Sequence, residues 1–360
     1  MQAYVRPENN LMKIAILGHA GIGYVWPMAM GLSRMLSRAG VDHEVFWNGL
    51  QLLRRSTGHS FHPKQLAKTF LSLPFLARLK TFDAIIVVQH LRDAFSDALA
   101  VEWLREKLPG TPIILYDLVY LPTVGLWGPW LPQANQQSGR TFGLERYDGY
   151  LCVSSINRCP MPPGDQPVQQ IGINLDDGSL YPEQGRFLAL VDFERKDFSE
   201  ERAIQLQALK NTKTEFIELH GQYPIMEIRK IYRRGSIYFL AHMESFGLPI
   251  CELQACGARI LTPRPDWCDA HRLPAQSLSP NFFIYENDTD LLEKQILELR
   301  TTMNPVQNLN TFKTHHPHFL HGDMDALQVF LDKLKTHEIH AKSHLQYADL
   351  MKSIAIRPGL

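Results

Sequence analysis

Two carboxylates and a glycine lie within one short stretch of the chain. Glu244 and Glu252 are eight positions apart, and residues 246–248, Phe-Gly-Leu, lie between them. Pro249 follows, and proline suits the first position of a helix because its missing N–H is not needed there. The free N–H groups of a first helical turn, together with the helix dipole, can bind a phosphate. Glu252 would lie one turn further along, where a carboxylate can accept hydrogen bonds from the vicinal hydroxyls of a ribose.

The N-terminal half offers two further candidates at the ends of predicted strands, where ligands bind in open α/β sheets. The loop Gly21-Ile22-Gly23 follows an apolar strand and precedes a helix, so its backbone could approach a diphosphate or a sugar closely. A plain tight turn is the alternative for this loop. His90 ends a second buried strand, where a ligand contact and a structural hydrogen bond are equally open.

Strand and helix patterns alternate along the chain in two series. Nearly continuous apolar strands separated by helices predict parallel sheets covered on both faces. The first series of predicted strands is Lys13–Gly18, His43–Trp47, Asp83–Gln89, Pro112–Tyr116, Gly149–Ser154 and Val168–Gly172. After a linker at Tyr181–Gln184, the second series is Phe187–Val191, Phe216–Leu219, Ile237–Ala241, Arg259–Thr262 and Phe282–Tyr285. We therefore predict two doubly wound halves with a cleft between them.

Length and composition agree with two globular domains. The 360 residues suffice for two cores, and the fractions of hydrophobic residues (45%) and charged residues (21%) are ordinary. The formal net charge is zero, which argues against nucleic acid as a partner. Five scattered cysteines without zinc-finger spacing favour reduced thiols in a cytoplasmic compartment. No apolar run suits a signal peptide or a spanning helix, so we expect the chain inside the cell.

The segment 237–263 resembles the donor-site signature of the retaining glycosyltransferases of family four, which depend on nucleotide sugars. The matching positions are Glu244, Phe246, Gly247, Glu252, Ala255, Cys256 and Gly257. Weaker similarity in order and spacing extends over most of residues 13–337. An ordinary strand–helix–strand unit with a tight glycine turn is the alternative, because short motifs carry a false-positive risk.

The resemblance implies the GT-B fold, in which two doubly wound Rossmann-like domains face each other across a cleft. It places an acceptor-side domain at 1–183, a nucleotide-sugar-binding domain at 184–337 and a tail, with flexibility left open, at 338–360. The implied activity, typical of polysaccharide biosynthesis, moves a sugar from a nucleotide-diphosphate sugar to a hydroxyl acceptor, glycan or lipid-linked, with retention of anomeric configuration. The donor is a co-substrate, and neither a tightly bound cofactor nor a metal is expected.

The resemblance also implies roles for individual residues. Glu244 and His90 would act at the transferred sugar, and Glu252 would hold the ribose. The remaining donor-binding positions would be Gly21, Gly23, Arg195, Lys196, Phe246, Gly247 and Leu248.

The chain departs from the family at the basic residues that neutralise the leaving diphosphate. The family places glycine-arginine soon after the first strand of the second domain, and a lysine five positions past the arginine. Here residues 190–197 read LVDFERKD, so Arg195 and Lys196 have a different spacing, and a solvated charged turn is the alternative. Two rival functions stay open: a catalytically inactive GT-B scaffold, and another GT-B enzyme such as an inverting transferase or a sugar-nucleotide epimerase.

Three other features carry alternatives of their own. Residues 45–82 contain six basic residues and no acid among apolar ones, which suits an anionic membrane surface at the inner face, or a solvated helical face packed on the sheet. Asp288-Thr289-Asp290 has the D-x-D form of a metal site, but its place before a helix favours a cap. The histidines from His315 to His321 favour a surface loop over a transition-metal site.

Overall fold

The computed structural model of the protein describes residues 12–19, 23–47, 73–89, 94–119, 146–154, 167–240, 242, 244, 246–274 and 277–345. The chain divides into two compact units, Met1–Asn174 with Asp323–Leu360, and Leu175–Gly322. These boundaries differ from the expected 183/184 and 337/338. Residues 175–183 pack with the second unit, and the last long helix packs with the first.

The first unit contains a six-stranded parallel sheet. Its strands are β1 (Lys13–Gly18), β2 (Asp42–Trp47), β3 (Ala84–Val88), β4 (Ile113–Val119), β5 (Gly149–Ser154) and β6 (Val168–Gln170). They lie in the order β2-β1-β3-β4-β5-β6, and every pair is parallel. From β1 the chain adds β2 on one side, and from β3 it adds β4, β5 and β6 on the other side. The sheet is therefore doubly wound, with its topological switch point at the carboxyl ends of β1 and β3.

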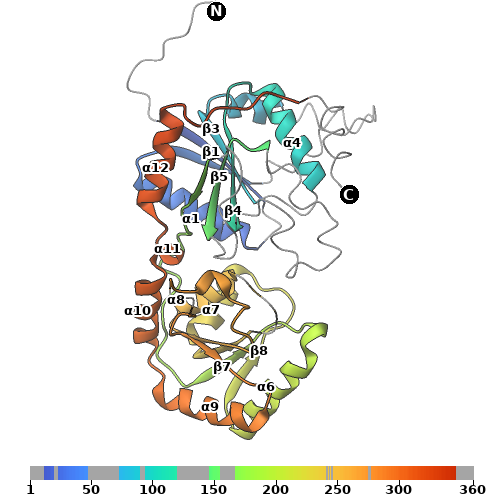
Figure 1. The fold of residues 1–360 in the computed structure, drawn as a ribbon, viewed down its shortest axis with the longest axis vertical. Helices are drawn as coiled ribbons and strands as arrows, with labels where there is room; N and C mark the ends of the chain where they lie inside the picture. Colours follow the sequence, from blue (N-terminus) through green and yellow to red (C-terminus); the bar gives the residue numbers. More distant parts are fainter. Residues whose placement is uncertain are drawn as a thin grey trace, which may run out of the picture. The chain divides into compact units, whose positions relative to one another are not determined.

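Helices cover both faces of this sheet (Figure 1). Right-handed crossovers that leave the switch point in opposite directions place α1 (Val25–Arg38) and α4 (Ala94–Lys107) on opposite faces. α12 (Met324–Lys335) also packs on the first unit, because Phe330 lies 3.1 Å from where a Cβ on Gly149 would be. The chain thus returns to the first unit after residue 322.

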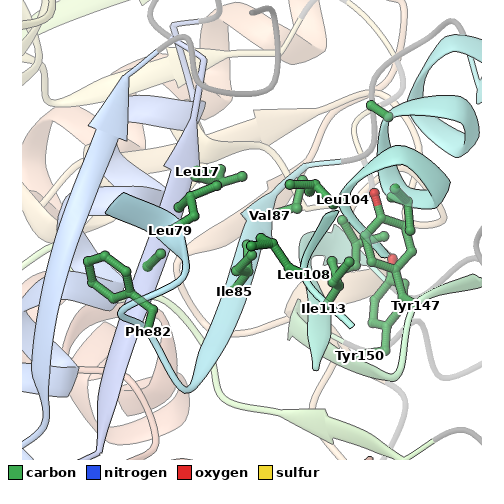
Figure 2. Packing of buried hydrophobic residues seen from close by; sticks show 14 of the residues in the cluster. Leu17, Leu79, Phe82, Ile85, Val87, Leu104, Leu108, Ile113, Tyr147 and Tyr150 are labelled. Atoms are coloured by element: carbon green, nitrogen blue, oxygen red, sulfur yellow. The ribbon is translucent and has the colours of Figure 1, made fainter. Parts of the chain in front are cut away.

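The core beneath α4 is shown in Figure 2. Leu17 of β1 packs beside Leu79 of a helical segment at 73–79, and Val87 of β3 lies next to Leu104 of α4. All four side chains are completely buried, and burying one leucine contributes about 1.5–3 kcal/mol. The described end of the basic segment 45–82 therefore packs on the sheet through Leu79. Residues 48–72 lie outside the described part, so the membrane-surface prediction stays a prediction.

The residues after α12 run along the first unit. Arg105 and Asp148 form a buried ion pair, with 3.0 Å between Nη2 and Oδ1, and the backbone N–H of Lys342 donates to the same Asp148 oxygen at 2.8 Å. Ile339 is buried. The segment expected to be a tail is therefore tied to the first unit as far as residue 345, since charged and apolar anchors hold it. Residues 346–360 lie outside the described part.

The second unit contains a five-stranded parallel sheet. Its strands are β7 (Leu188–Val191), β8 (Glu215–Glu218), β9 (Ile237–Phe239), β10 (Arg259–Thr262) and β11 (Phe282–Ile284). They lie in the order β11-β10-β9-β7-β8, and every pair is parallel. β8 lies on one side of β7, and β9, β10 and β11 follow one another on its other side. This sheet is therefore also doubly wound.

Helices cover both faces of the second sheet, and each face has its own hydrophobic core. α7 (Ile225–Arg234) and α8 (Leu248–Ala255) bury their apolar residues on one face. α6 (Ser199–Asn211) and α9 (Thr289–Thr302) bury theirs on the other. Tyr238 belongs to the first core and Phe239 to the second, as the alternation of side chains along a strand requires. This α/β/α layering fixes where the carboxyl ends of β7 and β9 emerge.

The local predictions can be compared with the described elements. Every strand predicted from the sequence is present among the described residues, with ends shifted by up to three residues. Asp288 caps α9, because the N–H of Leu291 donates to its Oδ1 at 2.9 Å, which confirms the cap in place of a metal-binding D-x-D motif. Among the described residues, no group of His, Cys, Asp or Glu is placed to hold a metal. None of their helices is long and apolar enough to span a bilayer.

Candidate functional site

The candidate site lies at the topological switch point of the second sheet, between β7 and β9. These strands pair directly, with Val191 opposite Phe239, so the residues that follow them emerge side by side. Asp192 follows β7, and His242 and Glu244 follow β9. Ligands of open α/β sheets bind outside the carboxyl ends of the strands at such a point. Three ionisable side chains are thus placed where a ligand is expected.

Gly247 makes the turn that leads into α8. Its φ of +59° lies in the left-handed region that favours glycine. A Cβ at this position would lie 2.7 Å from Ile250 Cδ1 and 3.2 Å from Glu244 Oε2. The Glu244 carboxylate therefore lies against the start of α8, where the first N–H groups and the positive end of the helix dipole point outward. The structure thus brings together Glu244 and the turn at residues 246–248.

His271 holds this turn from behind. Its Nε2–H donates to the Phe246 carbonyl oxygen at 2.6 Å, and the two rings stack with centroids 6.2 Å apart. Burial lowers the pKa of His271 to about 4, so the ring is neutral, and Nδ1 faces the Gln254 side-chain nitrogen at 3.5 Å. No motif in the sequence marks His271 as part of a site. It is a single histidine outside the segment 237–263, with no other candidate residue beside it.

Asp192, His242 and Glu244 form a row across the switch point. Asp192 Oδ2 lies 3.1 Å from His242 Nδ1, and His242 Nε2 lies 3.8 Å from Glu244 Oε1. The Asp192 side chain is buried, and its Oδ1 accepts from the N–H of Phe193 at 2.8 Å. Burial alone would raise the pKa of Asp192, but hydrogen bonds from His242 and Tyr238 lower it overall. Asp192 is therefore an ionised anchor that orients the imidazole, a pair that the sequence analysis did not identify.

Arg195 and Lys196 differ in their relation to this row. Burial raises the pKa of the Glu244 carboxyl, while the charges of His242 and Arg195 oppose the shift. Arg195 is exposed, yet it lies near enough for its charge to act on Glu244. Lys196 is exposed at the start of η3 (Lys196–Phe198). Of the two cations in the predicted donor site, Arg195 is the one that the structure associates with Glu244.

Glu252 is buried one turn into α8 and forms an ion pair with Arg229. Arg229 donates to Glu252 Oε1 from both Nε and Nη2, at 2.9 and 2.5 Å. Its Nη1 donates to Asp177 Oδ2 at 2.6 Å and to Ser179 Oγ at 2.7 Å. Burial alone would lower the pKa of Arg229, but the Glu252 and Asp177 carboxylates raise it, so the guanidinium stays charged. A ribose contact by Glu252 has to coexist with this ion pair.

The N-terminal candidates are only partly described. Gly21 and His90 lie outside the described residues, and Gly23 is exposed in the turn before α1. Gln89, directly before His90, has a φ of +68°. Residues other than glycine rarely adopt this backbone conformation, and such backbone strain is found at functional sites. The roles of Gly21, Gly23 and His90 stay predictions.

The histidine-rich segment corrects the prediction of a surface loop. α10 (Pro305–His315) ends directly before His316, and α11 (Pro317–Leu320) begins directly after it. His316 is buried and stacks on Phe319, with centroids 5.4 Å apart, and its ring is also 5.4 Å from that of His271. Burial lowers the pKa of His316 to about 2. His316 and Phe319 are buried because they form the packing behind the turn of the candidate site, while His315 is exposed.

Replacing Asp192 with asparagine is expected to make unfolding less sensitive to acid. The folded-state pKa of Asp192 lies below its ordinary value of 3.8. The carboxylate therefore contributes stability above about pH 4, which is lost as the pH falls through the folded-state pKa. Urea unfolding from about pH 3 to pH 6 should show a shallower acid decline in Asp192→Asn than in the wild type. The matched control Asp290→Asn, in the first turn of α9, should keep the wild-type slope. Equal slopes in all three proteins would contradict the prediction.

The chain matches no protein-family model and no curated protein sequence. It is similar over most of its length to solved structures. The catalytic domain of starch synthase IV from Arabidopsis thaliana, bound to ADP and acarbose, has a TM-score of 0.55 at 11% identity, covering 92% of this chain and 100% of that chain. A UDP-GlcNAc 2-epimerase from Neisseria meningitidis, bound to UDP-GlcNAc, has a TM-score of 0.53 at 12% identity, covering 90% and 100%. Anabaena HepE, in complex with UDP and glucose, has 0.51 at 12% identity, covering 90% and 100%.

The chain has the GT-B fold. The similarity agrees with the two doubly wound parallel sheets and confirms the fold class predicted from the sequence. Identities this low show the fold alone, because one fold carries many activities. Function has to be argued from the site on the second GT-B unit.

Proposed function

We propose that the protein is a glycosyltransferase that moves a sugar from a nucleotide-diphosphate sugar to a hydroxyl acceptor, with retention of anomeric configuration. The observation that carries this proposal is the Glu244 carboxylate lying against Gly247, at the start of α8 and at the switch point of the second sheet. An anion-binding helix start is thereby placed beside a carboxylate that can bind hydroxyls. Structural neighbours solved with UDP, UDP-GlcNAc or ADP support a nucleotide as the ligand.

Each part of the donor has a candidate partner in the second unit. The diphosphate binds the backbone N–H groups at the start of α8, contributed by Phe246, Gly247 and Leu248, with Arg195 nearby. Glu244 contacts the sugar, and Glu252 the ribose. Lys196 joins the diphosphate site only if η3 rearranges, because its side chain is exposed in this structure.

The proposed reaction needs no protein nucleophile. The bond between C1 of the sugar and the phosphate oxygen breaks, and the leaving diphosphate keeps the electron pair. The acceptor oxygen, from a glycan or a lipid-linked acceptor, bonds to C1 on the same face, and its proton passes to the leaving phosphate. Fixed N–H dipoles and cations stabilise the developing charge, and each well-placed donor contributes about 3 kcal/mol.

Nucleotide binding and donor turnover test the proposal directly. We expect one or more of the UDP-, ADP- and GDP-sugars to raise the thermal unfolding temperature and to be hydrolysed slowly without an acceptor. Glu244→Gln should reduce donor hydrolysis by about 100-fold, because the carboxylate at the reacting sugar is lost. The matched control Glu298→Gln, an exposed position on α9, should behave like the wild type.

The same assay decides between the open alternatives. An inactive GT-B scaffold is the second candidate, and the exposure and spacing of Arg195 and Lys196 favour it. No stabilisation by any nucleotide would support the scaffold and contradict the transferase. Release of a β-anomer from an α-linked donor would indicate an inverting transferase. Recovery of a sugar nucleotide with altered configuration at C2 would indicate an epimerase.

A further inference from the structure

His242 lies two positions before Glu244 and is not one of the residues that match the donor-site signature. Its two ring nitrogens face carboxylates from different strand ends, Asp192 at 3.1 Å from Nδ1 and Glu244 at 3.8 Å from Nε2. An ionised carboxylate can only accept, so Nδ1 carries a proton that it donates to Asp192. Nε2 then faces the side of the site where Glu244 lies against Gly247. About a quarter of the side chain is exposed, so a ligand can reach the ring.

We propose that protonated His242 is a cation that binds the leaving diphosphate through Nε2–H. This inference rests on the proposed function and deepens it. A diphosphate at the start of α8 would lie beside the Glu244 carboxylate, and the two negative groups would repel each other. An imidazolium between them donates to the phosphate and offsets this repulsion. His242 thereby fills the place of the arginine and lysine that the family spacing would supply.

Asp192 acts in this arrangement as a positioning residue. It is buried, and Tyr238, Phe193 and His242 all donate hydrogen bonds to its carboxylate, so it cannot turn away. Its charge stabilises the imidazolium from the side opposite the ligand. Among the described residues, Glu244 also faces the ring, and Arg195 acts on the charge of Glu244. The two carboxylates of Asp192 and Glu244 thus face the ring from its two nitrogens.

The proposal couples nucleotide binding to proton uptake. Because the bound diphosphate adds negative charge next to Nε2, it favours the protonated ring over the neutral one. Calorimetric titration of UDP and ADP into the full chain, in two buffers of different ionisation enthalpy between about pH 6.5 and pH 8.5, measures this uptake. We expect uptake of a fraction of a proton per nucleotide in the wild type.

Four variants isolate His242. His242→Gln should bind about 10- to 100-fold more weakly, the range of one hydrogen bond to a charged group, and should take up no proton. His242→Lys, which keeps a cation at every pH tested, should bind more tightly than His242→Gln and also take up no proton. Glu244→Gln should keep the uptake, because the titrating group is the ring. His315→Gln, at an exposed histidine that ends α10, should match the wild type.

The outcomes separate this inference from the proposed function. A wild-type protein that binds no nucleotide overturns the proposed function and the His242 role with it. Wild-type binding with unchanged proton uptake in a folded His242→Gln variant overturns the role of His242 alone. Loss of uptake in Glu244→Gln, with uptake kept in His242→Gln, assigns the proton to the carboxyl and likewise overturns it.

Discussion

Replacing Arg229 with methionine is expected to lower the free energy of unfolding of the second unit by about 3–5 kcal/mol. The guanidinium is completely buried and bonds Glu252, Asp177 and Ser179. Methionine keeps much of the side-chain volume but leaves the Glu252 carboxylate buried without its cation. Removing one partner of a buried ion pair exposes the full desolvation cost of the other. Urea unfolding, with hydrogen exchange to locate the loss in α7 and α8, measures the change.

The adjacent residue provides the matched control. Lys230 lies on the same helix, and its ion pair with Glu227 is exposed, so Lys230→Met should change the stability by less than about 1 kcal/mol. The double variant Arg229→Met/Glu252→Leu should be more stable than Arg229→Met alone, because it removes the unpaired carboxylate. A loss below about 1 kcal/mol in Arg229→Met would contradict the prediction that this ion pair stabilises the second unit.

Replacing Gly247 with alanine is expected to lower donor turnover by about 100-fold. The backbone at this position is left-handed, and the new Cβ would approach buried Ile250 and the Glu244 carboxylate. Relief of these contacts shifts the turn and Glu244 relative to the first N–H groups of α8. A displacement of about 1 Å is enough for a loss of this size. The hydrolysis rate of the best donor sugar, measured at saturating concentration, gives the effect.

Gly221 separates backbone strain from crowding at the site. Its φ of +66° is similar to that of Gly247, but a Cβ there would meet nothing within 4 Å. Gly221→Ala should therefore cost only the conformational strain, about 1–3 kcal/mol of stability, and leave donor turnover unchanged. Overpacking against Ile250 should make Gly247→Ala less stable than Gly221→Ala by a further 1–3 kcal/mol or so. Equal turnover in the two variants would remove Gly247 from the proposed site.

Glu252 has two contacts to reconcile, the observed ion pair with Arg229 and the expected contact with a ribose. The family resemblance gives it a ribose contact, while the structure shows its Oε1 bonded to Arg229. Both roles are compatible if Arg229 orients the carboxylate and the other oxygen meets the ligand. Any substitution of Glu252 changes the stability through Arg229 as well as nucleotide binding. The two effects have to be measured together before the ribose role is assigned.

Much of the fold could be predicted from the sequence, because strands buried on both faces have a distinctive pattern. The predicted strand Gly149–Ser154 has the observed ends, and the place of Asp288 before a helix predicts its observed role as a cap. The domain boundaries were harder to predict. The expected boundary places Asp177 and Ser179 in the first domain, but their bonds to Arg229 place them in the second unit.

The sequence alone determined the parallel α/β class, the order of the strands along the chain, and the acidic and glycine residues around the start of α8. These follow from short-range rules of side-chain pattern, proline and glycine placement, and helix capping. Only the tertiary structure decided what these residues meet. Asp192 reaches His242 because β7 and β9, which are separated by another strand and two helices in the chain, are neighbours in the sheet. Arg229 reaches Glu252 because α7 and α8 pack on one face of that sheet. Contacts between distant segments depend on strand order and helix packing, and no local pattern of residues encodes them.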